Sequence, residues 1–210
     1  MSRRLLTSSG GIALLRVHVV QGLLFVVLAQ FFAHAQRGAV TVPRALDQLT
    51  AEAEIIVHGS VVSTKIEPHP KLRNLNTIVV SLKVHDTYKG TAGKSLKFRQ
   101  YVWESPALEA AQYRKGQELL LFLGPVSEYG LSSPVGLEQG RFRILRTGKS
   151  APTTLNGRGN AGLFNSVLAR AKAHNLTLSS RTAEIAQRNQ AAPLRLSDLE
   201  DAIRSFVGAH

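Results

Sequence analysis

The sequence contains no cysteine, a single tryptophan and comparatively few acidic residues. The absence of cysteine excludes disulfides, thiol catalysis, cysteine-ligated zinc, iron–sulfur clusters and a lipid-modified N-terminal cysteine. The 14 Asp and Glu residues stand against 26 Lys and Arg residues, which gives a formal net charge of +12. The hydrophobic fraction of 44% is too high for a disordered chain. We therefore expect a basic globular protein that is stabilised by non-covalent packing alone.

The first 35 residues have the pattern of a secretory signal peptide. A head with three arginines and no acid is followed by an apolar stretch over residues 17–32, and then by Ala33 and Ala35 on either side of His34. Small side chains at these two positions fit the signal peptidase, so we expect cleavage after Ala35. Removal of residues 1–35 lowers the net charge from +12 to +9.

An uncleaved membrane anchor is the alternative interpretation of this segment. A spanning helix needs about 20 predominantly apolar residues, and His18, Gln21 and Gln30 interrupt the run. The arginine pair at residues 3–4 leaves open both the general secretory and the twin-arginine route. On either route we expect the protein to be exported, to the periplasm or the extracellular space.

Residues 36–147 are predicted to form a mainly β domain with a leading helix. The helix is expected over 44–51, with Thr41 as its cap and Pro43 in its first turn. Alternation and β-branched composition predict strands over 55–62, 77–88, 95–103 and 140–145. The continuous apolar run at 119–123 predicts a strand that is buried on both faces. A set of about five or six strands with short turns predicts a small antiparallel OB-like barrel, since closure protects strand edges.

The remaining residues are predicted to be a linker and a helical segment. Residues 148–162 are rich in Ser, Thr, Asn and Gly, which is typical of a flexible linker. They include a G-x-G-x-x-G pattern at 157–162, but no strand is predicted before it, so dinucleotide binding is not expected. In the C-terminal segment, 163–210, apolar spacing predicts one helix from Leu163 and a second behind a capping box at 197–200.

Four short motifs in the β domain resemble a known group of proteins. They are residues 53–61 (AEIIVHGSV), 88–90 (YKG), 116–123 (GQELLLFL) and 136–142 (GLEQGRF). Their order resembles that in exported bacterial proteins of uncharacterised function, whose module is similar to the OB-fold of netrin-like domains and tissue inhibitors of metalloproteinases. The resemblance implies a binding module. Many of these relatives carry Gly-Gly where this chain has Val102 and Trp103, and the inhibitors' zinc-chelating N-terminal cysteine has no counterpart here.

Two histidines, His58 and His85, lie on neighbouring predicted strands. In a hairpin centred near residues 71–72 they are directly opposed, with Cβ atoms about 5 Å apart. Such a pair can hold zinc or copper or give a pH-dependent surface, and His69 in the intervening loop can approach it. A catalytic zinc usually needs three protein ligands, and no carboxylate with ligand spacing is present, so solvated strand histidines are the simpler interpretation.

The polar positions of the second and third predicted strands carry cations and aromatic residues. These residues are Lys83, Lys97, Arg99, Tyr101 and Trp103. Faces of this kind bind polymers through charge and stacking in OB-folds. Anionic polysaccharide and lipid head groups are the ligands expected for such a face, whereas nucleic acid is not, because the exported compartment holds little of it. A solvated basic surface without a ligand is the plainer interpretation.

Catalytic motifs are absent from the sequence. There is no H-E-x-x-H, and residues 130–134 lack the last glycine of a nucleophile elbow. Ser, His and acid side chains can converge from separate segments, so a hydrolase without a motif stays a minor alternative. We expect a non-catalytic interaction module without a cofactor. Its leading partner is another exported protein, including a peptidase by analogy with the inhibitors, and its second is an anionic polymer or membrane surface.

Overall fold

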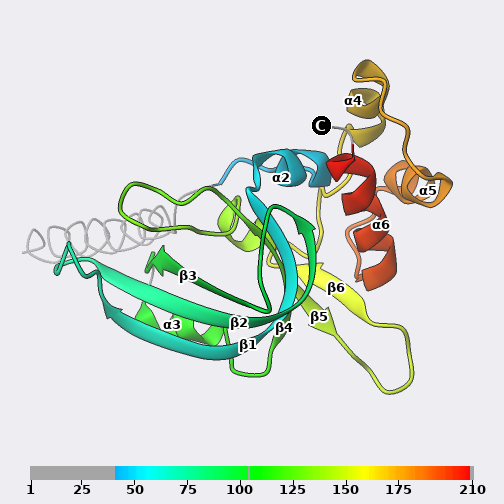
Figure 1. Ribbon diagram of the computed structural model, residues 1–210. Coiled ribbons are helices and arrows are strands. Elements are labelled where there is room, and N and C mark those ends of the chain that lie inside the picture. Colours follow the sequence, from blue (N-terminus) through cyan, green and yellow to red (C-terminus); the bar gives the residue numbers. More distant parts are fainter. Residues whose placement is uncertain (1–40, 104, 209–210) are drawn as a thin grey trace, which may run out of the picture. The chain divides into compact units, whose positions relative to one another are not determined.

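The computed structural model describes residues 41–103 and 105–208 (Figure 1). The predicted signal peptide, with Ala33 and Ala35, lies outside the described residues. Among the residues that the structure describes, no helix combines the length and the apolar character needed to cross a membrane.

Seven strands form one antiparallel sheet in the order β3-β2-β1-β4-β5-β6-β7. Their bounds are β1 Ile55–Pro68, β2 Asn76–Lys89, β3 Ser95–Tyr101, β4 Glu118–Leu123, β5 Arg141–Leu145, β6 Thr153–Asn156 and β7 Leu194–Arg195. The mainly β class is confirmed. The prediction of a closed barrel is wrong, because β3 and β7 end the sheet and do not pair with each other.

The sheet separates two hydrophobic cores. On one face, Ile56, Leu120 and Phe122 pack against the helices. On the other face, Leu119 and Leu121 belong to a second core, which is enclosed by the curled strands β1, β2 and β3. Every residue from Leu119 to Phe122 is fully buried, so the prediction that this apolar run is a strand buried on both faces is confirmed.

Helices cover one part of the sheet. They are α2 Leu46–Glu52, α4 Val167–Ala173, α5 Ser180–Arg188 and α6 Leu196–Val207, while α3 Pro106–Ala111 packs separately on β1 and β2 (Figure 1). A 3₁₀ helix, η1, spans Leu137–Gly140. The apolar stripe predicted for the last helix is confirmed, since Leu199, Ile203 and Phe206 are buried.

Three predicted helix starts are wrong. The helix expected from Leu163 begins only at Val167, because Leu163 and Phe164 lie in the turns that precede it. The other two differ at their caps. The first helix begins after Ala45, whose backbone N–H donates to the Gln48 side chain, and the Thr41 hydroxyl instead accepts a hydrogen bond from Gln139 Nε2. The last helix already begins at Leu196, so Ser197 lies inside it and does not cap it. In both cases tertiary contacts outweigh the local capping signal.

The segment 148–162 differs from the predicted linker. It contains β6, which pairs with β5 and with β7. Asn156 and Asn160 behind it are buried: the Asn160 backbone N–H donates to Asn156 Oδ1 and the Asn160 side chain donates to Thr154 O. The Gly and Asn residues that suggested a linker thus form a tight turn directly after β6, because the Asn156 side chain accepts hydrogen bonds from backbone N–H groups of the turn.

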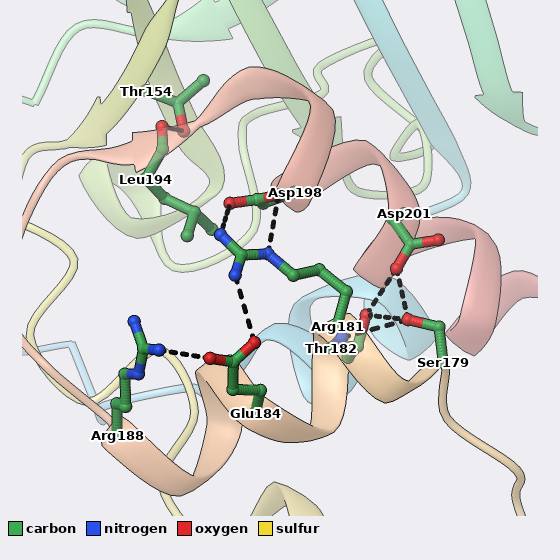
Figure 2. Close-up of polar contacts among 9 residues, drawn as sticks. All are labelled: Thr154, Ser179, Arg181, Thr182, Glu184, Arg188, Leu194, Asp198 and Asp201. Carbon is green, nitrogen blue, oxygen red and sulfur yellow. Dashed lines mark hydrogen bonds and ion pairs between the residues drawn. The ribbon is translucent and has the colours of Figure 1, made fainter.

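The C-terminal helices are fixed to one another by a polar network (Figure 2). The Arg181 guanidinium lies between Asp198 and Glu184, with Nη2 2.8 Å from Asp198 Oδ2. Asp201 accepts hydrogen bonds from the hydroxyls of Ser179 and Thr182. These contacts join α5 to α6, while Thr154 Oγ1 donates to Leu194 O between β6 and β7.

Candidate functional site

The strand register brings most of the predicted basic face together. Ser81 of β2 pairs with Lys97, Val79 with Arg99 and Thr77 with Tyr101, so alternate positions along β3 share one face with Lys83. This face lies at the end of the sheet remote from α4, α5 and α6 (Figure 1).

The cations on this face differ in their partners. Arg99 is largely occupied, because its Nη2 lies 2.6 Å from Glu67 Oε1 and its Nη1 donates to Thr77 Oγ1. Hydrogen bonds from Lys65 and then from Arg99 lower the pKa of Glu67 from 4.5 to about 2. Lys83 and Lys97 are exposed and make no ion pair within the described part of the chain. Only these two of the three predicted cations are available to a ligand.

An apolar pocket lies between β3 and the end of β4, where the sheet does not close. We call this gap the seam. Its pocket has a volume of about 290 Å³, and Ile55, Leu96, Phe98, Leu123 and Val126 supply its apolar lining. Lys97 and Arg99 border the pocket on one side and Glu54 on the other. The pocket is therefore a hydrophobic hollow with cations along the β3 edge.

The loop after β4 bridges the seam at one point. The Ser132 N–H donates to Arg99 O at 2.8 Å, which shows that the backbone groups of Arg99 point away from β2. His69 holds this loop: its Nδ1 accepts from two backbone N–H groups, so Nε2 carries the proton and donates to Tyr129 O. His69 is thus a structural residue that anchors the loop to the β1–β2 hairpin.

The remaining edge of β3 is open. Because backbone groups alternate in direction along a strand, Ser95 and Lys97 share the outward orientation of Arg99. Val102 N–H and Lys94 O bond to β2, which fits the same alternation. Among residues 41–103 and 105–208, no strand lies beyond β3 in the sheet. Within this part of the chain, the N–H and C=O groups of Lys97 are therefore unpaired next to the apolar pocket.

The two predicted metal-binding histidines are in contact, but not in the predicted register. A bulge at Gly59 shifts the pairing by one residue, so His58 lies opposite Asp86 and the two rings meet edge to face, with centroids 5.2 Å apart. A Cβ on residue 59 would lie 2.6 Å from Lys83 O, which explains why the bulge requires glycine. His58 is not a solvated strand histidine, since it is only 6% exposed.

Carboxylates flank His58 on both sides. Its Nε2 lies 2.7 Å from Glu118 Oε1, and its Nδ1 lies 3.5 Å from Asp86 Oδ2 without a hydrogen bond. Two hydrogen bonds from Arg146, followed by one from His58, lower the pKa of Glu118 from 4.5 to about 2, against the effect of its partial burial. This cluster ties β1, β2 and β4 to the chain after β5.

The cluster offers little to a metal or a substrate. Within the described residues, no group of three or more His, Asp or Glu side chains is arranged to hold a metal ion. Ser60 Oγ lies 2.8 Å from His85 Nε2, a distance suited to a nucleophile and its base. In the described part of the chain, no acid orients His85 from its other nitrogen. Zinc or copper binding and hydrolysis both stay predictions.

Two hollows lie in the helical layer, and most of the arginines that line them already have partners. One, of about 220 Å³, includes Arg181 and Arg188, which pair with Asp198 and Glu184. The exception is Arg195 in this first hollow, which is exposed and makes no ion pair within the described residues. The other, of about 350 Å³, includes Arg170, which makes a bidentate pair with Asp47. We therefore place the candidate site at the seam.

Comparison of the sequence with known protein families and curated proteins gives no relative from which a site could be inferred. No family model matches the chain, and no curated protein matches it significantly.

Proposed function

We propose that this protein is an exported, non-catalytic binding module that captures an extended segment of another protein along the open edge of β3. The observation that carries this proposal is that the backbone of Lys97, beside the apolar seam pocket, has no partner in the described part of the chain. Addition of a strand to an exposed sheet edge is a general mode of peptide recognition, in which main-chain hydrogen bonds supply affinity and pockets supply specificity.

The chemistry of the seam defines the peptide. Alternate side chains of an added strand point to the same face, so one apolar residue can enter the pocket formed by Ile55, Phe98 and Leu123. Lys83, Lys94 and Lys97 are exposed and make no ion pairs within the described residues, which favours acidic residues next to the apolar one. The expected partner is an exported protein with an extended, acidic and apolar segment.

An anionic polymer or lipid surface is the second candidate, supported by the same three lysines. Such a ligand has no row of backbone amides, so it cannot complete the β3 edge. Its binding would depend on charge alone and would weaken steeply with salt.

The OB-like resemblance belongs to this proposal as well. The order β3-β2-β1-β4-β5 with a gap at β3 is compatible with a partly open five-stranded barrel. On this interpretation, β6, β7 and the helices extend the sheet on the side away from the seam.

The experiment selects displayed peptides on residues 36–210 and measures the affinity of the best one by fluorescence anisotropy. Lys97→Pro removes an outward N–H but no ladder bond to β2, so binding should fall at least about tenfold, while Lys97→Ala should cost only the charge contribution, about two- to fivefold. Successive amides of the bound peptide point alternately towards β3 and away from it. N-methylation of the amides that face β3 should abolish binding, and N-methylation of the amides that face away should not change it.

The proposal fails if no selected peptide binds more tightly than about 1 mM. It also fails if the affinity of the peptide is unchanged both by Lys97→Pro in the protein and by N-methylation of either set of alternate peptide amides. Retention on heparin or anionic vesicles that is lost in Lys83→Ala/Lys97→Ala but kept in Lys83→Arg/Lys97→Arg would identify the polymer alternative.

A further inference from the structure

We propose that Trp103 and the hollow beside it form a binding site for a neutral sugar unit. This site lies beyond the end of β3 and does not rest on the peptide proposal. Trp103 is the single tryptophan of the chain and is 53% exposed, which is unusual for so large an apolar side chain. Its ring meets Tyr101 edge to face, with centroids 5.0 Å apart.

A buried polar network holds Trp103 in place. The Tyr113 hydroxyl donates to Gln100 Oε1 at 2.8 Å, and Gln100 Nε2 donates to Glu109 Oε2 at 3.0 Å. The other Glu109 oxygen accepts a long hydrogen bond from the backbone N–H of Trp103. Gln100 and Glu109 are only 2% and 4% exposed, so this support is rigid. The aromatic ring is thus presented to solvent on a fixed backbone, which lowers the entropy lost on binding.

Polar side chains with free capacity surround a small hollow next to the ring. Its volume is about 60 Å³, and Gln112, Glu138 and Arg141 line it together with Trp103. The side chains of Gln112 and Glu138 make no hydrogen bond or ion pair within the described residues. Among the described residues, the Arg141 guanidinium interacts with the ring and hydroxyl of Tyr113, and its carbon lies 5.1 Å from the ring centre. A donor, an acceptor and an amide that serves as both are therefore available.

This combination matches the chemistry of a sugar ring. One face of a pyranose presents C–H groups, which pack on the electron-rich face of an aromatic ring in the same way as the positively polarised edge of a second aromatic ring does. The vicinal hydroxyls at its rim each donate and accept, which suits Arg141, Glu138 and Gln112. Two carboxyl side chains and one guanidinium line the hollow, so the site does not favour an anionic ligand. The hollow fits one hydroxyl-bearing edge, with the rest of the ring on Trp103.

The position of Trp103 makes the test direct, because all tryptophan fluorescence of the chain comes from this site. We expect cellotetraose, maltotetraose or chitotetraose, titrated into residues 36–210 at millimolar concentrations, to give a saturable blue shift or quench of the emission. In calorimetry, Trp103→Ala should weaken the binding of that oligosaccharide at least about tenfold, and Gln112→Ala about three- to tenfold. Tyr129→Ala removes an exposed aromatic ring from the loop that bridges the seam and should leave sugar binding unchanged.

The proposal is overturned if none of the three oligosaccharides changes the emission saturably. It is also overturned if Trp103→Ala binds the oligosaccharide as tightly as the unsubstituted protein. Loss of binding in Tyr129→Ala as strong as in Trp103→Ala would also overturn it, because the ligand would then lie at the seam. A seam peptide added at saturation should leave the sugar affinity unchanged, so the two proposals can fail separately.

Discussion

The two ends of the sheet solve the problem of an exposed edge in different ways. At the β7 end, α6 follows the short last strand directly, and Arg170, Arg181 and Arg188 of the helical layer are paired with carboxylates. At the β3 end, the edge is bridged by one backbone hydrogen bond from Ser132, and Lys83 and Lys97 have no partner in the described structure. An open edge is a liability for aggregation unless it is charged or covered.

This difference separates stability from recognition. Closed ion pairs and buried aromatic rings fix the position of the helices at the β7 end. Unpaired backbone groups and free cations at the β3 end cost little in stability because water solvates them, and they remain available to a partner. Substitutions should therefore affect unfolding at one end and binding at the other.

The largest expected effect comes from replacing one buried phenylalanine by alanine at each end of the sheet, which compares how tightly the two ends are packed. Phe142→Ala, next to Phe122 in the helix-covered core, should lower the free energy of unfolding by about 3–5 kcal/mol. Phe98→Ala borders the seam pocket, where neighbouring groups and water can fill the void, and should cost less, about 2–3 kcal/mol. Urea unfolding followed by circular dichroism measures both. Equal losses would mean that the seam is packed as tightly as the closed end.

The sequence predicted the elements whose pattern is set by burial. The clean alternation of 77–88, the run Leu119–Leu123 and the stripe of the last helix each occur as strand or helix close to the expected bounds. These segments are specified by which side chains avoid water, and that information is local.

What the sequence could not predict depends on partners far along the chain. β6 reads as a polar linker because its partners are β5 and the distant Leu194, and His58 is buried because Glu118 and Arg146, 60 or more positions away, cover it. A glycine inside a strand is typical of a bulge or bend, but Gly59 does not reveal that the register of His58 shifts. The seam leaves no sequence signal, since closure of a barrel is a property of the whole sheet.

A smaller effect compares paired and free charges. Asp198→Ala removes a buried acid that holds Arg181 in a bidentate pair, and should lower the free energy of unfolding by about 1–2 kcal/mol, since Arg181 is itself partly exposed. Lys97→Ala, at the open end, should change it by less than about 0.5 kcal/mol. Thermal unfolding at one protein concentration provides the comparison. A Lys97 variant as destabilised as the Asp198 variant would contradict the division between the ends.

The smallest effect concerns the carboxylates that pair with Arg146 and Arg99. The folded-state pKa values of Glu118 and Glu67 are both lowered from 4.5 to about 2, so each stabilises the fold fully above pH 4.5 and loses this contribution as the pH falls towards 2. Glu118→Gln should flatten the decline of the unfolding free energy in this window. Glu67→Gln should flatten it less, because the Glu67 side chain is more exposed and its ion pair with Arg99 links β1 to β3, which are both already held by β2. Glu128→Gln, an exposed position without an ion pair in the described structure, is the control. If Glu67→Gln flattened the decline as much as Glu118→Gln, the ion pair at the open end would contribute as much to the fold as the one that joins β1, β4 and the chain after β5.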